Sequence, residues 1–298
     1  MLFLLLATLH VVPIGDFTLE KGGTIHDCRL GYRTFGELAE DKSNVIVVLT
    51  WFGGTSEGLT FWAGRGKLYD SSKYFVVVID AFGDGISSSP SNGADAEFTM
   101  RDMVRAQHEL LTRELKLDHV FAISGLSMGG MQTFEWIALY PRFMTKAVPI
   151  VGSPKLTSYD LLLWKTELSI IDTPAGMKAA ADINEMHLHT PSYINSHVHD
   201  IDQLMKDHEA SVAKIKVADY ASQLRAMIGH DIGSVPAKVP QMMIVVSAQD
   251  QMVNPAPAAE FARATNSELV TLTGDCGHLA TSCESDLLTR EVHRFLAH

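Results

Sequence analysis

The stretch that decides the fold runs from His119 to Gly130 and reads HVFAIS followed by GLSMGG. Its first six residues form an apolar run typical of a buried strand, and a helical pattern that ends before Pro141 follows it. A serine between two glycines on a strand-to-helix turn is the pattern of a nucleophile elbow, because glycines leave room for a strained backbone. The free N–H groups at the helix start favour negative charge beside the serine. The sequence therefore predicts Ser127 as a nucleophile rather than part of a structural Gly-rich turn.

Similar apolar runs recur along the chain and alternate with helical patterns. They predict strands over residues 44–50, 73–80, 119–124, 146–151, 241–247 and 268–273. Strands this apolar are typical of a mostly parallel sheet that helices cover on both faces. A helix is expected to begin after Thr99, whose hydroxyl can cap it, with Asp102 three residues on. The predicted fold class is α/β.

The interval 153–240 differs from the rest of the chain, since it is helical in pattern and has no convincing strand. It separates two strands of one sheet, so we expect a core of residues 1–152 and 241–298 with a helical insertion over 153–240. The insertion could be a lid over an active site or a cluster of surface helices. A lid is favoured, because insertions at the carboxyl ends of parallel strands usually build the pocket.

A serine nucleophile requires a base, and the base requires an orienting acid. Asp250 follows the predicted strand 241–247, and His278 follows the predicted strand 268–273. Both lie where a strand ends at the expected pocket edge, in the chain order serine, acid, histidine. Asp275 is a competing acid, but it is too near His278 in sequence to lie at the end of the preceding strand. The predicted catalytic triad is Ser127, Asp250 and His278.

Stabilising a reaction oxyanion requires two backbone N–H donors. The first is predicted to be Met128, the residue after the nucleophile. The second is expected from the loop 50–55, where Phe52 is the predicted donor and Trp51 the alternative. The glycines of this loop allow the backbone to turn over the site.

Composition excludes several classes of function. The 298 residues contain 24 Lys and Arg against 35 Asp and Glu, a net charge of −11, which disfavours binding to nucleic acid or to an anionic lipid surface. No apolar run has the length of about 18 residues that a membrane span needs. The apolar stretch Met1–Leu9 could be a signal-peptide remnant or a first buried strand, so the compartment stays open, with the cytoplasm favoured and export the alternative.

The three cysteines, Cys28, Cys276 and Cys283, are too few for a disulfide scaffold. Free thiols are expected at such sparse usage, and a bridge between Cys276 and Cys283 is the alternative. Four histidines of the insertion have H-x-H spacing but no convincingly placed acidic or thiol partner, so they are interpreted as surface residues and not as metal ligands. They are His187, His189, His197 and His199. No metal or organic cofactor is expected.

Several stretches resemble the homoserine O-acetyltransferase family of α/β hydrolases, over about residues 32–154 and 218–279. They are Tyr32–Leu38, Lys73–Val76, Gly83–Pro90, Ser127–Gln132, Glu135-Trp136 and Tyr140-Pro141. Asp250 and His278 fall on the acid and base positions of that family. The resemblance implies the α/β-hydrolase fold, an acylated Ser127, a proton shuttle at His278, and a homodimer with the lid at its interface.

The chain departs from that family in its substrate-binding residues. Leu279 follows the predicted base, at the position where the transferases carry an aspartate that recognises the amino-acid acceptor. The Trp51–Gly54 loop also lacks the His-Ala-Leu-Thr-Gly motif of those transferases. The predicted substrate contacts are Trp51, Gly53, Leu279 and Arg225, the last as the candidate for binding a carboxylate.

The family also contains members that hydrolyse small acetate esters, and Leu279 favours that reaction. The predicted function is therefore a serine hydrolase of small acetyl-type esters. The alternative is an acyltransferase that moves an acetyl group from acetyl-CoA to homoserine or a similar alcohol. A non-catalytic binding module is disfavoured, because all three triad residue types are present.

Overall fold

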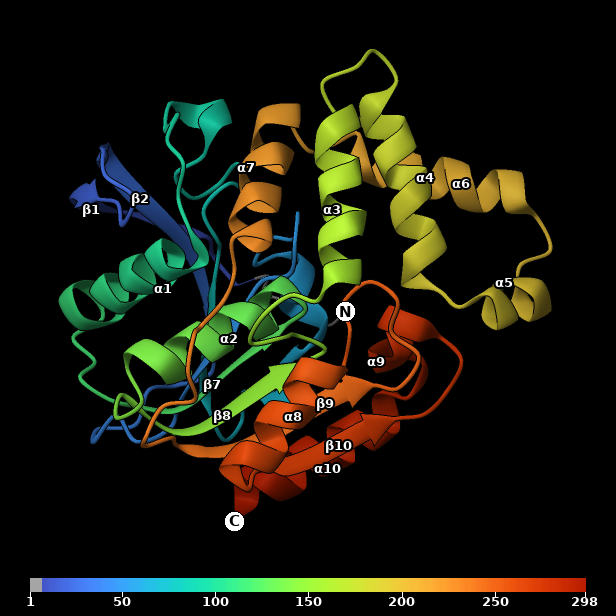
Figure 1. Cartoon of the computed structure of the whole chain (residues 1–298). Coiled ribbons are helices and arrows are strands. Elements are labelled where there is room, and N and C mark those ends of the chain that lie inside the picture. Colours follow the sequence, from blue (N-terminus) through green and yellow to red (C-terminus); the bar gives the residue numbers. More distant parts are fainter. Residues whose placement is uncertain (1–6) are drawn as a thin grey trace, which may run out of the picture.

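The computed structural model describes residues 7–298. Its centre is an eight-stranded sheet with the strand order β1-β2-β6-β3-β7-β8-β9-β10 (Figure 1). Strands β6, β3, β7, β8, β9 and β10 are parallel, whereas β2 runs antiparallel to both β1 and β6. The strands are β1 (His10–Thr18), β2 (Thr24–Phe35), β3 (Val45–Leu49), β6 (Phe75–Ile79), β7 (Val120–Leu126), β8 (Met144–Ile150), β9 (Gln241–Ser247) and β10 (Glu268–Leu272), with a separate pair β4 (Ala63–Gly64) and β5 (Tyr69–Asp70).

The six predicted strands are all present, with ends within two residues of the predicted ones. Each of the five residues of β3 is buried, as a strand covered on both faces requires. The sequence missed β1 and β2. Most of β1 is exposed, so it lacks the continuous apolar run by which the other strands were predicted.

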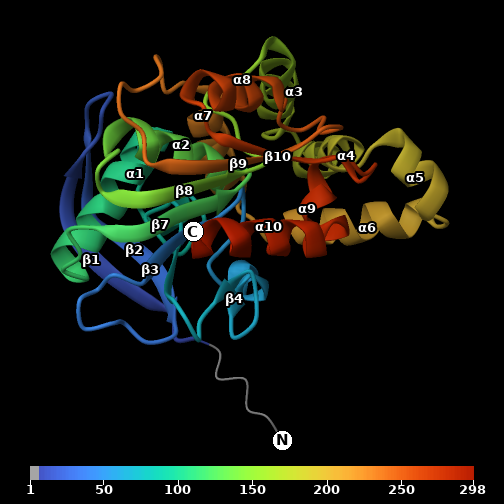
Figure 2. The ribbon, with the colours of Figure 1, turned by 90° about the horizontal axis from the view of Figure 1, so that it is seen from below.

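Helices cover both faces of the sheet. On one face, alternate β3 residues pack with α1 (Met100–Glu109), α2 (Met128–Leu139) and α8 (Ala256–Thr265). On the other face, the remaining β3 residues pack with α10 (Ser285–Ala297) and the β4–β5 region. Figure 2 shows α10 lying across the sheet on the side opposite α2. The two faces of each central strand are therefore buried by different helices.

The expected cap of α1 is confirmed. The Thr99 hydroxyl accepts a hydrogen bond from the Asp102 N–H (3.1 Å), and the Asp102 carboxylate accepts one from the Thr99 N–H (3.0 Å). This reciprocal pairing satisfies N–H groups that a helix start leaves free. A single π turn, Leu110–Glu114, extends α1 at its other end.

Five helices occupy the interval 153–240, and they gather at one end of the molecule (Figure 1). Among them, α3 packs on α4 and α7, and α4 packs on α6. Their bounds are α3 (Ser158–Ile170), α4 (Gly176–Leu188), α5 (Pro191–His197), α6 (Ile201–Val212) and α7 (Val217–Ile228), and the short α9 (Ala280–Cys283) follows later in the chain.

The predicted alternatives for the N-terminal stretch Met1–Leu9 concern mainly residues 1–6, which lie outside the described residues. The first described strand begins at His10. Within residues 7–298, no helix combines the length and apolar character needed to cross a membrane.

Candidate active site

Ser127 lies between the end of β7 at Leu126 and the start of α2 at Met128. Its backbone has φ 56° and ψ −113°, a conformation that non-glycine residues rarely adopt. A side chain on Gly125 would place its Cβ 2.2 Å from the Gly129 carbonyl oxygen, and one on Gly129 would approach the Leu49 carbonyl oxygen to 2.2 Å. Both glycines are therefore required for the close approach of α2 to β3 and β7.

Replacing Gly129 with alanine is expected to destabilise the fold by about 3 kcal/mol, because its Cβ would meet backbone atoms that have no room to move. Urea unfolding of the purified variant measures this loss. Gly229→Ala is the matched control, since its Cβ would be 3.6 Å from the Arg225 carbonyl oxygen, an ordinary van der Waals contact, and its φ is negative. An equal unfolding midpoint for the two variants would contradict the expected close packing at the elbow.

The three side chains predicted as a triad lie in hydrogen-bond contact. The His278 Nε2 atom is 2.9 Å from the Ser127 Oγ atom, and its Nδ1 atom is 2.7 Å from Asp250 Oδ2. A carboxylate only accepts hydrogen bonds, so Nδ1 carries the proton and Nε2 accepts from the serine hydroxyl. The side chains of His278 and Asp250 are 7% and 1% exposed, so water competes little for these bonds.

Backbone groups hold the acid and the histidine in place. Asp250 Oδ1 accepts hydrogen bonds from the N–H groups of Met252 and Val253, each at 2.8 Å. The Ser247 hydroxyl donates to the Gly277 carbonyl (2.7 Å), directly before the histidine. Each Asp250 oxygen therefore has its own partners, and the carboxylate orientation is fixed.

The competing acid Asp275 makes different contacts. Its carbonyl oxygen accepts from the Thr190 hydroxyl, and its carboxylate lies 3.5 Å from the Ser192 hydroxyl. These contacts join the loop after β10 to the start of α5. The carboxylate that bonds to His278 belongs to Asp250.

The predicted oxyanion donors both have free amides. Among residues 7–298, neither the Phe52 N–H nor the Met128 N–H has a hydrogen-bond partner within the protein. The loop that carries Phe52 turns at Gly53, which has φ +69°. Its turn is closed by a hydrogen bond from the Gly54 N–H to the Trp51 carbonyl (2.9 Å).

A cavity of about 820 Å³ opens onto Ser127 and His278. Its walls come from the core and from helices α3, α4, α6 and α7 of the insertion. Much of the lining is apolar, including Phe61, Leu126, Ile215, Leu224, Met227 and Met252. The predicted substrate contacts Trp51, Gly53 and Leu279 line this cavity, as does Phe52. Arg225 does not: it is exposed on α7, so its predicted place in the site is wrong.

A buried polar cluster in the cavity wall was not predicted from the sequence. The Tyr220 hydroxyl donates to Glu167 Oε2 (2.8 Å) and accepts from the Asn184 side-chain amide (2.9 Å). Burial raises the pKa of Glu167 to about 7 and raises that of Tyr220 as well. No local sequence signal marked it, because Glu167, Asn184 and Tyr220 lie on three different helices.

The expectation of free thiols is wrong for two of the three cysteines. Cys276 and Cys283 form a disulfide, while Cys28 is free and buried. The bridge closes a short loop that contains His278. Spacing alone could not decide the pairing, because it depends on how the chain turns through the 3-10 helix Gly277–Leu279 into α9.

Replacing both Cys276 and Cys283 with serine is expected to lower the free energy of unfolding by about 2.5 kcal/mol, since the open loop has more freedom in the unfolded chain. Thermal unfolding with and without a thiol reductant measures the effect. The reductant should destabilise the wild-type protein and leave the double variant unchanged. Alkylation of three thiols in the non-reduced, denatured protein would show that the bridge is absent.

The histidines of the insertion interact with nearby side chains. His189 Nδ1 bonds to Glu185 (2.7 Å), and the His189 ring stacks on Tyr193, which stacks in turn on His197. Within the part of the chain that the structure describes, no group of three or more His, Cys, Asp or Glu side chains is arranged to hold a metal ion.

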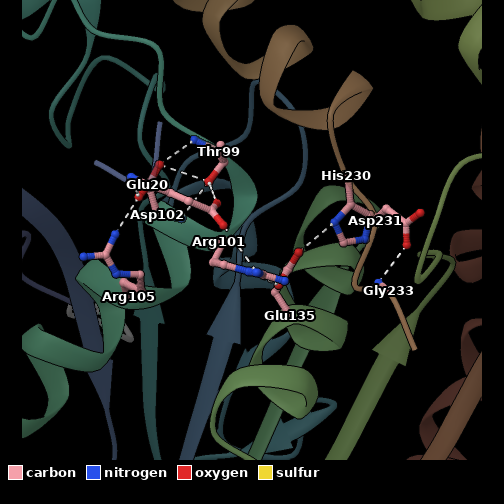
Figure 3. Close-up of polar contacts among 9 residues, drawn as sticks. All are labelled: Glu20, Thr99, Arg101, Asp102, Arg105, Glu135, His230, Asp231 and Gly233. Carbon is pink, nitrogen blue, oxygen red and sulfur yellow. Dashed lines mark hydrogen bonds and ion pairs between the residues drawn. The ribbon is translucent and has the colours of Figure 1, made fainter. Parts of the chain in front are cut away.

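A buried network ties α2 to its neighbours (Figure 3). Glu135, on α2, accepts from Arg101 Nε (3.3 Å), and its other oxygen lies 3.4 Å from His230 Nδ1. Arg101 also bonds to Glu20 near the surface, and His230 Nε2 lies 2.8 Å from the Ser153 carbonyl. The helix that begins at the elbow is thus bonded to α1 through Arg101, and it lies beside His230, which contacts Ser153 at the start of the insertion.

Comparison with known proteins agrees with this geometry. A family model described as alpha/beta hydrolase fold matches residues 44–180. A solved structure of an acetyl esterase, MekB, superposes with a TM-score of 0.93 at 24% identity, covering 98% of each chain. The chain has the α/β-hydrolase fold. The predicted fold class is confirmed, and the α/β-hydrolase fold places the elbow, the acid and the histidine at the carboxyl edge of one sheet.

Relatives of this α/β-hydrolase chain include hydrolases and transferases. It is 40% identical over 176 residues to a "probable esterase" of Corynebacterium glutamicum, covering 56% of this chain and 50% of the relative. It is 35% identical over 178 residues to an ethyl acetate hydrolase of Pseudomonas veronii, covering 57% and 51%. It is 36% identical over 160 residues to a homoserine O-acetyltransferase of Chlorobium chlorochromatii, covering 49% and 44%. The matched part of the chain spans about half the length of these curated relatives.

Proposed function

We propose that this protein hydrolyses short-chain carboxylic esters through an acyl-enzyme formed on Ser127. The observation that carries the proposal is the hydrogen-bonded series Ser127, His278 and Asp250 at the wall of a largely apolar cavity. The relatives named as an esterase and as an ethyl acetate hydrolase support the same reaction.

In the proposed mechanism, His278 Nε2 takes the hydroxyl proton as Ser127 Oγ attacks the ester carbonyl carbon. Asp250 holds the proton on Nδ1 and stabilises the imidazolium that forms. The oxyanion is expected to accept from the N–H groups of Phe52 and Met128, which have no partner in the described residues. When the tetrahedral intermediate collapses, His278 protonates the leaving alcohol. Water then attacks the acyl-enzyme by the same steps and releases the acid.

We also propose that residues 153–240 act as a lid over this site. Helices α3, α4, α6 and α7 contribute lining residues to the cavity, while the reacting side chains come from the core. This division supports a role for the insertion in substrate selection and in excluding bulk water.

Acetyl transfer to an alcohol is the second candidate, because a homoserine O-acetyltransferase is among the relatives. Leu279 lines the cavity directly after the base and favours an uncharged alcohol over an amino acid at that wall. A purely binding role is disfavoured, since all three side chains of the triad are in hydrogen-bond contact.

The test is a pair of assays on the purified protein. Acid release from ethyl acetate and from a panel of short-chain 4-nitrophenyl esters is followed in a pH-stat. CoA release from acetyl-CoA is measured with and without L-homoserine. We expect ester hydrolysis and no homoserine-dependent CoA release. CoA release that requires homoserine, with O-acetylhomoserine as product, would instead establish the transferase.

A further inference from the structure

Helix α7 of the insertion reaches the loop 50–55 through one fully buried side chain, Gln223. Its Oε1 atom accepts a hydrogen bond from the Gly53 N–H (2.8 Å), and its Nε2 atom donates to the Phe82 carbonyl (2.9 Å). Gln223 therefore joins the loop after β3 to the loop after β6. Both loops start at the carboxyl edge of the sheet, where Ser127 lies.

The contact bears on the direction of the Phe52 N–H. That N–H shares a planar peptide with the Trp51 carbonyl, which accepts from the Gly54 N–H (2.9 Å). In a trans peptide the two groups point in opposite directions, so this bond turns the Phe52 N–H away from the turn. The next peptide, with the Gly53 N–H, is held by Gln223. Two consecutive peptide planes are thus fixed, one by the loop and one by the insertion.

One further contact of α7 reaches the same loop, and a second reaches the segment after β6. The Tyr220 ring, one helical turn before Gln223, packs edge-on against the Phe52 ring with centroids 4.5 Å apart. Asp219 accepts hydrogen bonds from the N–H and the hydroxyl of Ser91, which anchors the start of α7 to the core. The face of α7 toward the core therefore contacts the Phe52 side chain and the N–H of Gly53, the residue after the predicted oxyanion donor.

We propose that Gln223 is a positioning residue for the oxyanion hole, through which the helical insertion sets the rate of acyl transfer. The inference rests on the proposed function of Ser127 and adds a role for a residue that does not itself touch the reacting atoms. A preorganised donor stabilises charge only if it is held where the oxyanion forms, so loosening the Gly53 peptide should weaken transition-state binding more than substrate binding.

The experiment compares Gln223→Met, which keeps the side-chain length and removes both bonds, with Asn44→Leu. Asn44 is the matched control, because its side chain likewise accepts from a backbone N–H and donates to backbone carbonyls, but near the start of β3, at the opposite end of the sheet. We expect Gln223→Met to lower kcat for ester hydrolysis about tenfold or more with KM within about twofold, and to weaken a trifluoromethyl ketone inhibitor in parallel. Asn44→Leu should leave kcat, KM and this inhibition unchanged.

Hydrogen–deuterium exchange of the peptide covering residues 51–56 separates this proposal from the proposed function. We expect faster exchange of the Gly53 amide in Gln223→Met, whether or not the protein hydrolyses esters. Unchanged exchange would overturn the positioning role by itself. Faster exchange with unchanged kcat would overturn the link to catalysis, whereas a wild-type protein inactive on every ester would reject the proposed function and, with it, the catalytic part of the role.

Gln223→Glu provides a second test of the proposal if the methionine variant does not fold. A protonated glutamate has the shape of glutamine, and it can both accept from Gly53 and donate to the Phe82 carbonyl. We expect its ratio of kcat to the wild-type value to rise as the pH is lowered and the carboxyl group becomes protonated. A ratio that does not change with pH would contradict the proposed pair of bonds.

Discussion

Replacing Ser127 with alanine is expected to lower kcat/KM for a short acetate ester by about 10⁵-fold or more. The serine Oγ is the atom that forms the acyl bond in the proposed mechanism, and its hydroxyl is the group that meets His278 Nε2 at 2.9 Å. Alanine removes that atom and leaves the rest of the site in place, so the residual rate measures what the predicted oxyanion donors and the cavity contribute without the nucleophile.

The alanine variant should fold normally. The hydroxyl makes one side-chain hydrogen bond in the structure, to His278, so its loss affects little of the packing. We expect the variant and the wild-type protein to have equal unfolding midpoints. We also expect a fluorophosphonate to label the wild-type protein and not the variant. Ser169→Ala, at an exposed position on α3, is the control and should retain full activity. Turnover by Ser127→Ala near the wild-type rate would exclude an acyl-Ser127 intermediate.

Replacing Asp250 with asparagine is expected to lower kcat by about 10⁴-fold, because it forces the wrong histidine tautomer. The N–H groups of Met252 and Val253 both point at Oδ1, so the asparagine oxygen will occupy that position. Its NH₂ group then faces His278 Nδ1, which must become an acceptor and leave the proton on Nε2. In that state Nε2 cannot accept the proton of Ser127.

Asp275→Asn is the matched control for this prediction, since Asp275 is the competing acid in the sequence and bonds elsewhere in the structure. We expect its kcat to stay within about twofold of the wild-type value. Steady-state rates over a range of pH measure both variants. A larger loss of kcat in Asp275→Asn than in Asp250→Asn would assign the orienting acid to Asp275 instead.

Much of the fold was predictable because the central strands are buried on both faces. Strands β3, β6 and β9 read as continuous apolar runs, and the order serine, acid, histidine follows from where such strands end. The mainly exposed β1 has no such run. The sequence around Arg225 did not show which side of its helix faces the core. Arg225 lies two positions after Gln223, about 200° around the helix axis, and so faces away from the core.

The polar part of the site was less predictable, because its contacts join residues far apart in the sequence. Tyr220 meets Glu167 across 53 positions, and Gln223 meets Gly53 across 170. A glutamine on a helix is typical of a solvated surface, and only the packing of α7 on the core makes this one buried. The cysteine pairing likewise depends on the path of the chain around His278.

The bridge made by Gln223 bears on how enzymes of this design can diversify. The proposed catalytic side chains belong to the core, so an exchange of the whole insertion would look like a simple route to new substrates. The Gly53 N–H, however, donates its hydrogen bond to Gln223, a residue of that insertion. If Gln223 has the proposed positioning role, a transplanted insertion must supply an equivalent buried acceptor at the same point, or it will alter substrate range and turnover together.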